Sequence, residues 1–406
     1  VVDVPGHERL VRTMIAGASG IDVLLLVIAA DEGTMPQTRE HLAICSMLGI
    51  EHGVVAITKR DLVDDEWMEL VEHDISEELK GTFLEKAPKV PVSATTRDGL
   101  DDLLAALEKV ARKAQRRSKE GILRLPIDRV FTMKGFGTVV TGTLVSGRLR
   151  LEDPIELLPS GFQGRIRGLQ VHGDSVEEST AGTRTAVNIQ GLEVDESLRG
   201  EWIVHPNSVQ PSQRIDVELT LLPAFPRPLK NRSKAFVHAG TTNTESVMHL
   251  LEGETLHPGQ KTYAHIQCND PIVVMANDRL ILRGTERLEG HGHTIGGATV
   301  IRTQARRPRK KTVTLEELKA LENAASTEER IGLLVKHEGI AGIELKQLVQ
   351  KLDIGPTETK KALKKLVRDN VVVSFGQNGS VHRNHLETLE RLARERISAY
   401  HQEQPM

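Results

Sequence analysis

Three short strings of polar residues near the start of the chain each follow a run of apolar residues. The first, Asp3-Val4-Pro5-Gly6-His7-Glu8, comes directly after Val1-Val2. A carboxylate at the end of a strand can hold a hydrated magnesium ion, and a nearby glycine lets a backbone N–H approach a terminal phosphate. The Asp-x-x-Gly pattern is short, however, and an acidic turn explains it equally well. Alone, it is weak evidence for a nucleotide site.

The other two strings fit the recognition of a guanine base. Thr58-Lys59-Arg60-Asp61 follows the apolar run 54–58. The Asp61 carboxylate can accept two N–H groups from a guanine edge while the Lys59 stem packs over the base, although a charged loop explains this string alone. Ser93-Ala94 would complete the pocket through backbone contacts. Because α/β proteins bind ligands at the carboxyl ends of strands, the three strings in this order indicate a guanine-nucleotide site.

The segments between these strings alternate short apolar runs with amphipathic stretches. Residues 21–30 are nearly all apolar, which is typical of a parallel strand covered on both faces. Further strands are expected at 54–58 and 89–93. Helices are expected at 38–48, 66–79 and 100–113. This alternation predicts a doubly wound α/β domain over residues 1–115.

The remaining chain divides into a β-rich and a helical region. Short β-rich runs separated by Gly, Pro, Asn and Asp predict two antiparallel β barrels, at residues 121–207 and 210–304. After the basic linker 305–311, Ser326 and Glu329 form a capping box that starts a helix. Helices at 344–352 and 357–369 and a hairpin formed by 371–375 and 380–382 follow. Three short helices and a hairpin predict a winged helix over residues 313–385, with 386–406 beginning a further helical module.

Several of these strings resemble known protein families. The α/β strings resemble the G domain of the translational GTPases related to elongation factor Tu: DVPGHE at 3–8, EGTMPQTREHL at 32–42, TKRD at 58–61 and SA at 93–94. The run GFGTVVTGT at 135–143 resembles the tRNA-contacting barrel of that family. LPIDRVFTMKGFGTVVTGT at 125–143, combined with a winged helix, is similar to the selenocysteine-specific elongation factors. The resemblance covers essentially the whole chain. It implies a cytosolic GTPase, with GTP and Mg²⁺ as cofactors, that delivers selenocysteinyl-tRNA to the ribosome at recoded UGA codons.

The resemblance assigns roles around the phosphates. Asp3 corresponds to the aspartate that holds Mg²⁺ through water, and Pro5-Gly6 corresponds to the γ-phosphate sensor. His7 corresponds to the histidine that orients the attacking water on the ribosome, and it would act by positioning and electrostatics because phosphoryl transfer needs little proton abstraction.

The resemblance also assigns roles around the base. Thr58, Lys59 and Asp61 correspond to the residues that read guanine, completed by Ser93 and Ala94. Thr58 stands where asparagine is more widespread, which should remove one hydrogen bond around the base.

The phosphate-binding string GxxxxGK[ST] does not occur in the 406 residues. In the family this string lies upstream of Asp-x-x-Gly, in a segment of a few dozen residues. Loss of the cradle should remove most of the nucleotide affinity. We interpret the absence as an N-terminally truncated G domain, because the remaining strings are intact. We expect GTP to bind at least about 100-fold more weakly than with that segment, a loss of roughly 3 kcal/mol.

The first predicted barrel offers groups that could recognise selenocysteine. A selenol is more acidic than a thiol, whose pKa is about 8.5, so selenocysteine is largely ionised at neutral pH. By resemblance to the family, Asp128 lines the aminoacyl pocket and grips the α-amino group, while Arg129 and Arg184 face the selenolate. The alternative is that Asp128 and Arg129 form a surface pair on the rim of the barrel.

Composition excludes several classes of protein. The two cysteines, Cys45 and Cys268, lie far apart, so neither a disulfide framework nor a zinc site is expected, and a reducing, cytosolic setting fits. Cys45 is expected in a core. The longest apolar run, 23–30, is far too short for a membrane span. His291 and His293 have no third ligand nearby, so a glycine-rich turn is expected there rather than a metal site.

Basic residues gather at one place in the helical region: Lys360, Lys361, Lys364, Lys365 and Arg368. They alternate with apolar residues, so they form either a solvated helix face or a nucleic-acid contact. Their place on the third helix of a winged fold, together with the basic linker 305–311, favours the second. A hairpin in selenoprotein mRNA would be bound by further winged-helix modules that this chain mostly lacks.

Two other functions compete with the delivery of selenocysteinyl-tRNA. A general aminoacyl-tRNA carrier is opposed by the helical region, because such carriers end after the second barrel. A nucleic-acid-binding protein whose G domain no longer hydrolyses GTP is favoured by the missing phosphate cradle. The intact His7, Lys59 and Asp61 oppose it.

Overall fold

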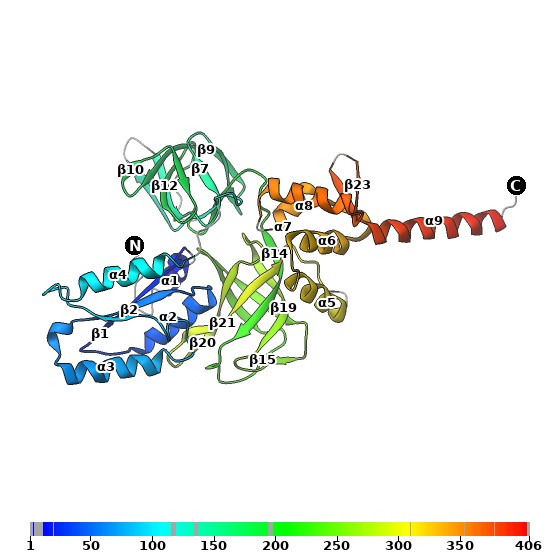
Figure 1. Cartoon of the computed structure of the whole chain (residues 1–406). Helices are drawn as coiled ribbons and strands as arrows, with labels where there is room; N and C mark the ends of the chain where they lie inside the picture. The colour runs from blue at the N-terminus through cyan, green and yellow to red at the C-terminus, as the bar shows by residue number, and fades with distance from the viewer. Residues whose placement is uncertain are drawn as a thin grey trace.

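The computed structural model describes residues 3, 11–18, 20–114, 119–133, 137–193, 198–308, 310–352, 354–376 and 378–403. Four parts follow one another along the chain: an α/β part, two β parts and a helical part (Figure 1). The last helix, α9 (Arg383–Glu403), extends away from the other elements. None of the helices in these ranges is both long and apolar enough to cross a membrane.

The α/β part has the expected alternation of strands and helices. Strands β1 (Leu24–Ala29), β2 (Gly53–Thr58) and β3 (Lys89–Pro91) form a parallel sheet in that order. Its helices are α1 (Val11–Ala18), α2 (Pro36–Met47), α3 (Asp65–Glu78) and α4 (Leu100–Ala111). The three strands and three helices predicted between residues 21 and 113 are therefore confirmed.

The outer strand β1 is less covered than its composition predicts. Only Ile28 in this strand is buried, and Val27 is 57% exposed. The expectation of cover on both faces is therefore wrong for β1, whereas β2 is buried from Gly53 to Ile57. The reason is position: among the described residues β1 has a neighbouring strand on one side only.

Two antiparallel β parts follow, as predicted, and they are called the first barrel and the second barrel below. The first is a curled sheet with the order β4-β13-β8-β9-β12-β6-β5, to which β10 adds beside β9, and β7 pairs with β11. The bounds are β4 (Arg124–Pro126), β5 (Arg129–Met133), β6 (Gly137–Thr143), β7 (Arg148–Arg150), β8 (Pro154–Leu158), β9 (Phe162–Val171), β10 (Asp174–Ser175), β11 (Glu178–Thr180), β12 (Arg184–Ile189) and β13 (Trp202–Val204). Most of its buried aliphatic side chains form one cluster.

The second β part is a closed barrel with the order β14-β19-β17-β16-β20-β21. The bounds are β14 (Ser212–Leu221), β16 (Lys234–Ala239), β17 (Thr242–Leu250), β19 (Lys261–Ile272), β20 (Arg279–Leu288) and β21 (Gly292–Arg302), with β15 (Leu229–Lys230) pairing with β18 (Thr255–Leu256) beside it. This barrel contacts the other parts. Helix α2 packs on β20 and β21, and α5 packs on β21.

The helical part contains the predicted helices and hairpin. It comprises α5 (Lys311–Glu322), α6 (Thr327–His337), β22 (Ile343–Glu344), α7 (Leu345–Lys351), α8 (Pro356–Arg368), β23 (Val372–Phe375) and β24 (Gly379–His382). The strands form a sheet in the order β22-β24-β23. Ser326 caps α6 by accepting a hydrogen bond from Glu329 N at 3.1 Å. In a capping box the Glu329 side chain would accept from the backbone N–H of Ser326. Here Glu329 Oε2 instead accepts from the preceding residue, Ala325 N, at 2.8 Å.

We expect two partly buried histidines to make the stability of the fold depend on pH. Burial lowers the pKa of His41 on α2 and of His337 at the end of α6. His41 Nε2 and His337 Nδ1 have no hydrogen-bond partner among the described residues. Because both folded-state pKa values lie below the unfolded value near 6.5, the unfolded chain gains protons first, and stability is lost as the pH falls below about 6.5.

We expect the free energy of unfolding to fall between pH 7.5 and pH 5.5, because the unfolded chain takes up protons on these histidines before the folded chain does. The double variant His41→Gln/His337→Gln should lose less stability over the same interval. Urea denaturation followed by circular dichroism at both pH values measures the difference. His257→Gln, at an exposed histidine, is the control, and an acid response of the double variant equal to that of the control would contradict the prediction.

Candidate functional site

The predicted base-binding segments meet at one edge of the parallel sheet. The register pairs Ala29 with Thr58, and Ile57 with Pro91, so the three strands end side by side. Backbone bonds continue beyond the strand ends. Ala30 N donates to Thr58 O at 2.8 Å, and Arg60 N donates to Val92 O at 3.2 Å. Residues 30–32, 58–61 and 92–94 therefore line this edge together.

Lys59 is fixed across the edge by two carboxylates. Its backbone is left-handed, with φ 59° and ψ 34°, where the chain turns from β2 into a short 3₁₀ helix, Arg60–Leu62. Its Nζ lies 2.8 Å from Asp31 Oδ2 and 3.0 Å from Glu32 Oε1. The hydrogen bonds with Asp31 and Glu32 raise the pKa of Lys59. A non-glycine residue in this conformation is strained, and such strain is concentrated at functional sites.

The Asp61 carboxylate is available to a ligand. Asp61 is exposed, and no described residue donates a hydrogen bond to its side chain. The Thr58 hydroxyl is directed back to the sheet and donates to Ile28 O at 3.3 Å. The two oxygens of Asp61 are therefore the acceptors that this loop presents to solvent.

The loop after β3 is held by a tight turn. Ser93 is buried; its N donates to Asp98 O at 3.0 Å, and its Oγ accepts from Thr96 N at 3.1 Å. Gly99 has φ +71°, and a Cβ there would lie 2.1 Å from Pro91 O, so only glycine fits. Ala94 is exposed, and no described residue accepts from its N–H. This N–H is therefore a free donor beside Asp61 and Lys59.

The predicted phosphate side lies mostly outside the described residues. Asp3 is exposed, and Pro5, Gly6 and His7 are outside the described ranges. No group of three potential metal ligands is found within those ranges. The roles of Asp3 in binding Mg²⁺ and of His7 in catalysis stay predictions.

The candidate aminoacyl residues are only partly brought together. Arg184 Nη2 donates to Asp128 Oδ1 at 2.8 Å, and Nη1 forms an ion pair with the other oxygen. Thr141 Oγ1 donates to Asp128 Oδ1 at 2.9 Å. Arg129 on β5 is exposed and takes no part in this group. Sequence analysis therefore missed Thr141, which lies in the quoted GTVVTGT run, and the surface pair of Asp128 with Arg129 does not form.

A cavity of about 370 Å³ opens on the first barrel along the strands that carry Arg184 and Thr141. It is lined by Val139, Leu151, Arg167, Gly168, Leu169, Gln170, Ser175, Val176, Ala186 and Asn188. Ala186 and Asn188 follow Arg184 on β12, and Val139 precedes Thr141 on β6. The cavity therefore opens on the two strands that carry Thr141 and Arg184, although neither these residues nor Asp128 line it.

The other candidates have structural explanations. His291 Nδ1 lies 3.2 Å from Glu289 O, and His293 Nδ1 lies 3.2 Å from Glu286 O, so a backbone carbonyl engages one nitrogen of each ring. Cys45 is buried as predicted, and burial raises the pKa of its thiol to about 12, which makes it unreactive. The predicted basic face of α8 is exposed at Lys360, Lys361, Lys364, Lys365 and Arg368.

Comparison with known proteins gives matches along the chain. Residues 1–113 match the family model of the elongation factor Tu GTP binding domain, residues 137–204 match elongation factor Tu domain 2, and residues 212–307 match the β-barrel domain of selenocysteine-specific elongation factors. The selenocysteine-specific elongation factor of Desulfomicrobium baculatum is 41% identical over 408 residues, covering 100% of this chain and 64% of the relative.

The chain is homologous to the selenocysteine-specific elongation factors. The Escherichia coli member is 34% identical over 80% of this chain and 50% of its own length. The crystal structure of a bacterial selenocysteine-specific elongation factor matches with a TM-score of 0.81 and 28% identity, over 98% of this chain and 63% of that one. The chain thus spans between half and two thirds of the length of these curated relatives.

A further family structure comes from Methanococcus maripaludis and is a complex with the GTP analogue GppNHp. It matches with a TM-score of 0.67 and 26% identity, over 76% of this chain and 71% of that one. The α/β part is accordingly a G domain of the elongation factor Tu type, followed by the two β-barrel parts of the family.

Proposed function

We propose that this chain belongs to a GTPase that delivers selenocysteinyl-tRNA to the ribosome at recoded UGA codons. The observation that carries the proposal is the gathering of Lys59, Asp61 and Ala94 at one edge of the sheet in a chain homologous to this family. GTP and Mg²⁺ are the proposed cofactors. The proposed partners are selenocysteinyl-tRNA, the ribosome and, through other modules, a selenoprotein mRNA hairpin.

The exposed donors and acceptors of the edge complement a guanine base. Asp61 would accept from the N1–H and the exocyclic amino group, and the Ala94 N–H would donate to O6. The stem of Lys59 would cover one face of the base, because Asp31 and Glu32 hold its ammonium group at 2.8 and 3.0 Å. Adenine presents the opposite pattern, so this edge would reject it. Bound Mg²⁺, on the Asp3 side, would neutralise charge on the phosphates.

The first barrel would hold the aminoacyl end of the tRNA. Asp128 uses Arg184 and Thr141 as donors, and its side chain is 18% exposed, whereas that of Arg184 is 36% exposed. A guanidinium has five N–H donors, so Arg184 can hold Asp128 and still face an anion. The adjacent cavity, lined by Val139, Ala186 and Asn188, would take the terminal nucleotide. This arrangement would place a selenolate beside Arg184 and the α-amino group beside Asp128.

Arg184→Ala should weaken binding of selenocysteinyl-tRNA by about 10- to 100-fold, because a partly desolvated charged hydrogen bond contributes roughly 1.5–3 kcal/mol. Seryl-tRNA with the same tRNA body should lose far less affinity, since its hydroxyl is uncharged. Protection of the aminoacyl ester from hydrolysis, measured with GTP present, gives both affinities. Arg129→Ala, at the exposed arginine of β5, tests the second cation of the proposed pocket.

Equal weakening of both charged tRNAs by Arg184→Ala would mean that this arginine serves the tRNA backbone. Arg184→Lys keeps the positive charge but loses the fork that holds Asp128, so it should recover part of the discrimination. A loss of discrimination in Arg129→Ala but not in Arg184→Ala would move the selenolate site to β5.

A further inference from the structure

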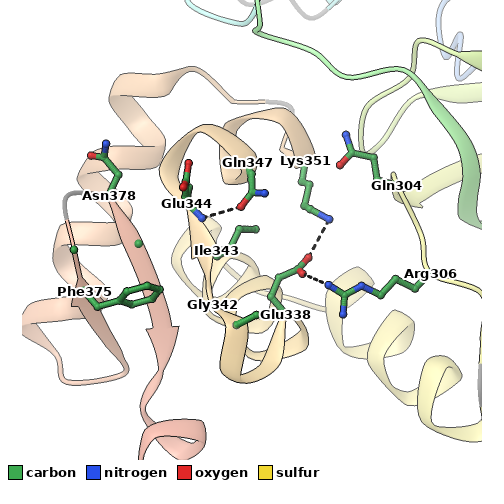
Figure 2. A pocket seen from close by; sticks show the side chains of 13 residues that line it. Gln304, Arg306, Glu338, Gly342, Ile343, Glu344, Gln347, Lys351, Phe375 and Asn378 are labelled. Carbon is green, nitrogen blue, oxygen red and sulfur yellow. Dashed lines mark hydrogen bonds and ion pairs between the residues drawn. The ribbon is translucent and has the colours of Figure 1, made fainter.

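A polar cavity of about 680 Å³ lies between the segment that leaves the second barrel and the hairpin of the helical part (Figure 2). Its lining comes from three places. Gln304 and Arg306 belong to the segment after β21. Seven lining residues belong to the turn before β22, to β22 and to α7: Glu338, Ala341, Gly342, Ile343, Glu344, Gln347 and Lys351. Four belong to the hairpin: Phe375, Gly376, Asn378 and Gly379. Neither the residues at the guanine edge nor Asp128, Thr141 and Arg184 line this cavity.

One wall of this cavity is an exposed aromatic ring. Phe375, at the end of β23, is 48% exposed. A Cβ added at Gly342 or at Gly379 would lie 2.7 Å from atoms of the ring. The ring therefore packs against two stretches of bare backbone, and in Figure 2 it extends toward the cavity. An apolar ring supported in this way is a platform for stacking rather than part of a core.

The opposite wall carries fixed charges. Glu338 Oε2 accepts from Arg306 Nη2 at 2.8 Å, and Glu338 Oε1 lies 3.0 Å from Lys351 Nζ (Figure 2). The Arg306 side chain is 77% exposed, whereas that of Lys351 is 12% exposed. Because Lys351 also neutralises Glu338, Arg306 keeps donors for a second anion.

Besides Gln304, two residues with side-chain amides line the cavity. Gln347 Oε1 accepts from Glu344 N at 3.0 Å, which leaves the amide nitrogen of this exposed residue directed to solvent. Asn378 is exposed on the hairpin side of the cavity. Amide groups donate and accept at once, so they match the mixed edges of nucleobases.

We propose that this cavity binds one unpaired nucleotide of single-stranded RNA. The base stacks on Phe375, its edge meets the amides of Gln347 and Asn378, and a flanking phosphate pairs with Arg306. Stacking on an aromatic ring suits any base, because every base has a π face. Glu338 and Glu344 repel a continuous run of phosphates, which favours a single splayed nucleotide over a duplex. The proposal needs neither GTP nor aminoacyl-tRNA, so it goes beyond the proposed function and can fail independently of it.

Phe375→Ala should weaken binding of a fluorescein-labelled 12-nucleotide oligouridylate by about 10-fold, as expected for the loss of one stacked base. Phe375→Trp should keep the affinity within about threefold, because indole also stacks. Ser374→Ala, at an exposed neighbour on the same strand, is the matched control and should bind as the unaltered chain does. Fluorescence anisotropy without added nucleotide measures all four proteins.

Arg306→Gln adds a second readout, the dependence of affinity on salt. Loss of one phosphate contact should lower the slope of log affinity against log salt by about 0.7, the value for single strands. Oligouridylate annealed to oligoadenylate should show no difference between the unaltered chain and Phe375→Ala, because its bases are paired.

Equal affinity of Phe375→Ala and Ser374→Ala for the single strand would overturn the proposal. So would a Phe375→Trp variant as weak as Phe375→Ala, or a duplex that loses as much affinity as the single strand. Photocrosslinking with 4-thiouridine gives a direct test in the unaltered chain. A crosslink at residues 375–379 supports the proposal, whereas crosslinks confined to the basic face of α8 would place the RNA there instead.

Discussion

Asp61→Asn should change the ratio of guanosine to xanthosine nucleotide affinities by about 1000-fold, or roughly 4 kcal/mol. The carboxylate of Asp61 presents two acceptors, and no described residue uses them. An asparagine presents one donor and one acceptor, so it opposes the amino group of guanine and pairs with the additional carbonyl of xanthine. The loss for guanosine and the gain for xanthosine both contribute to the change in the ratio.

Isothermal titration with GDP and XDP at millimolar concentration measures this switch. The high concentration is appropriate because the 406 residues contain no GxxxxGK[ST] string, so the contacts to the base carry a larger share of the affinity. Glu66→Gln is the control, since Glu66 is an exposed carboxylate nearby at the start of α3. A preference for GDP in Asp61→Asn as strong as in Glu66→Gln would refute the role assigned to Asp61.

The guanine edge was predictable because its determinants are local. Each string follows an apolar strand directly, and parallel strands end at the same edge of a sheet, so Lys59, Asp61 and Ala94 had to lie close together. The acidic partners of Lys59 were not predicted. Asp31 and Glu32 lie 28 and 27 residues away in sequence, and nothing in their own spacing marks them as partners of a lysine.

The direct contact between Asp128 and Arg184 could not be predicted from the sequence. Asp128 and Arg184 were expected in one pocket, but with separate roles, and the structure pairs them directly. The pairing depends on β6 lying between β5 and β12 in the sheet, which sequence spacing does not reveal. How deeply a strand is buried also depends on the order of strands in the sheet. The apolar composition of β1 therefore predicted more burial than the structure shows.

Helix α5 was missed for a different reason. It begins at Lys311, and its N-cap residue, Lys310, makes no side-chain capping bond. Without a Ser, Thr, Asp or Asn at that position, the usual start signal is absent. Its stability comes instead from tertiary packing, because Leu318 and Leu321 join a buried cluster with Ile301 of the second barrel.

An ion pair joins the two β parts, and it too could not be predicted because its partners are far apart in sequence. Arg124 Nη1 donates to both carboxylate oxygens of Asp278, at 2.9 and 2.6 Å, across 154 residues of sequence. The Arg124 side chain is 3% exposed and that of Asp278 is 19% exposed. Asp278 Oδ2 also accepts from Met275 N at 2.8 Å, which fixes the turn before β20. Both partners are therefore held in one geometry inside the contact between the barrels.

Asp278→Ala should lower the free energy of unfolding by about 3–5 kcal/mol, because it removes the carboxylate that compensates a buried guanidinium. Glu178→Ala removes the partner of Arg150 in a pair whose side chains are 55% and 36% exposed, and it should lower stability far less, because water screens an exposed pair. Urea denaturation can be followed by the fluorescence of Trp202, which is buried at the same contact. Similar losses in the two variants would show that water reaches the Arg124–Asp278 pair. A large loss in Asp278→Ala alone would show that the buried charge pair stabilises the contact between the two β parts.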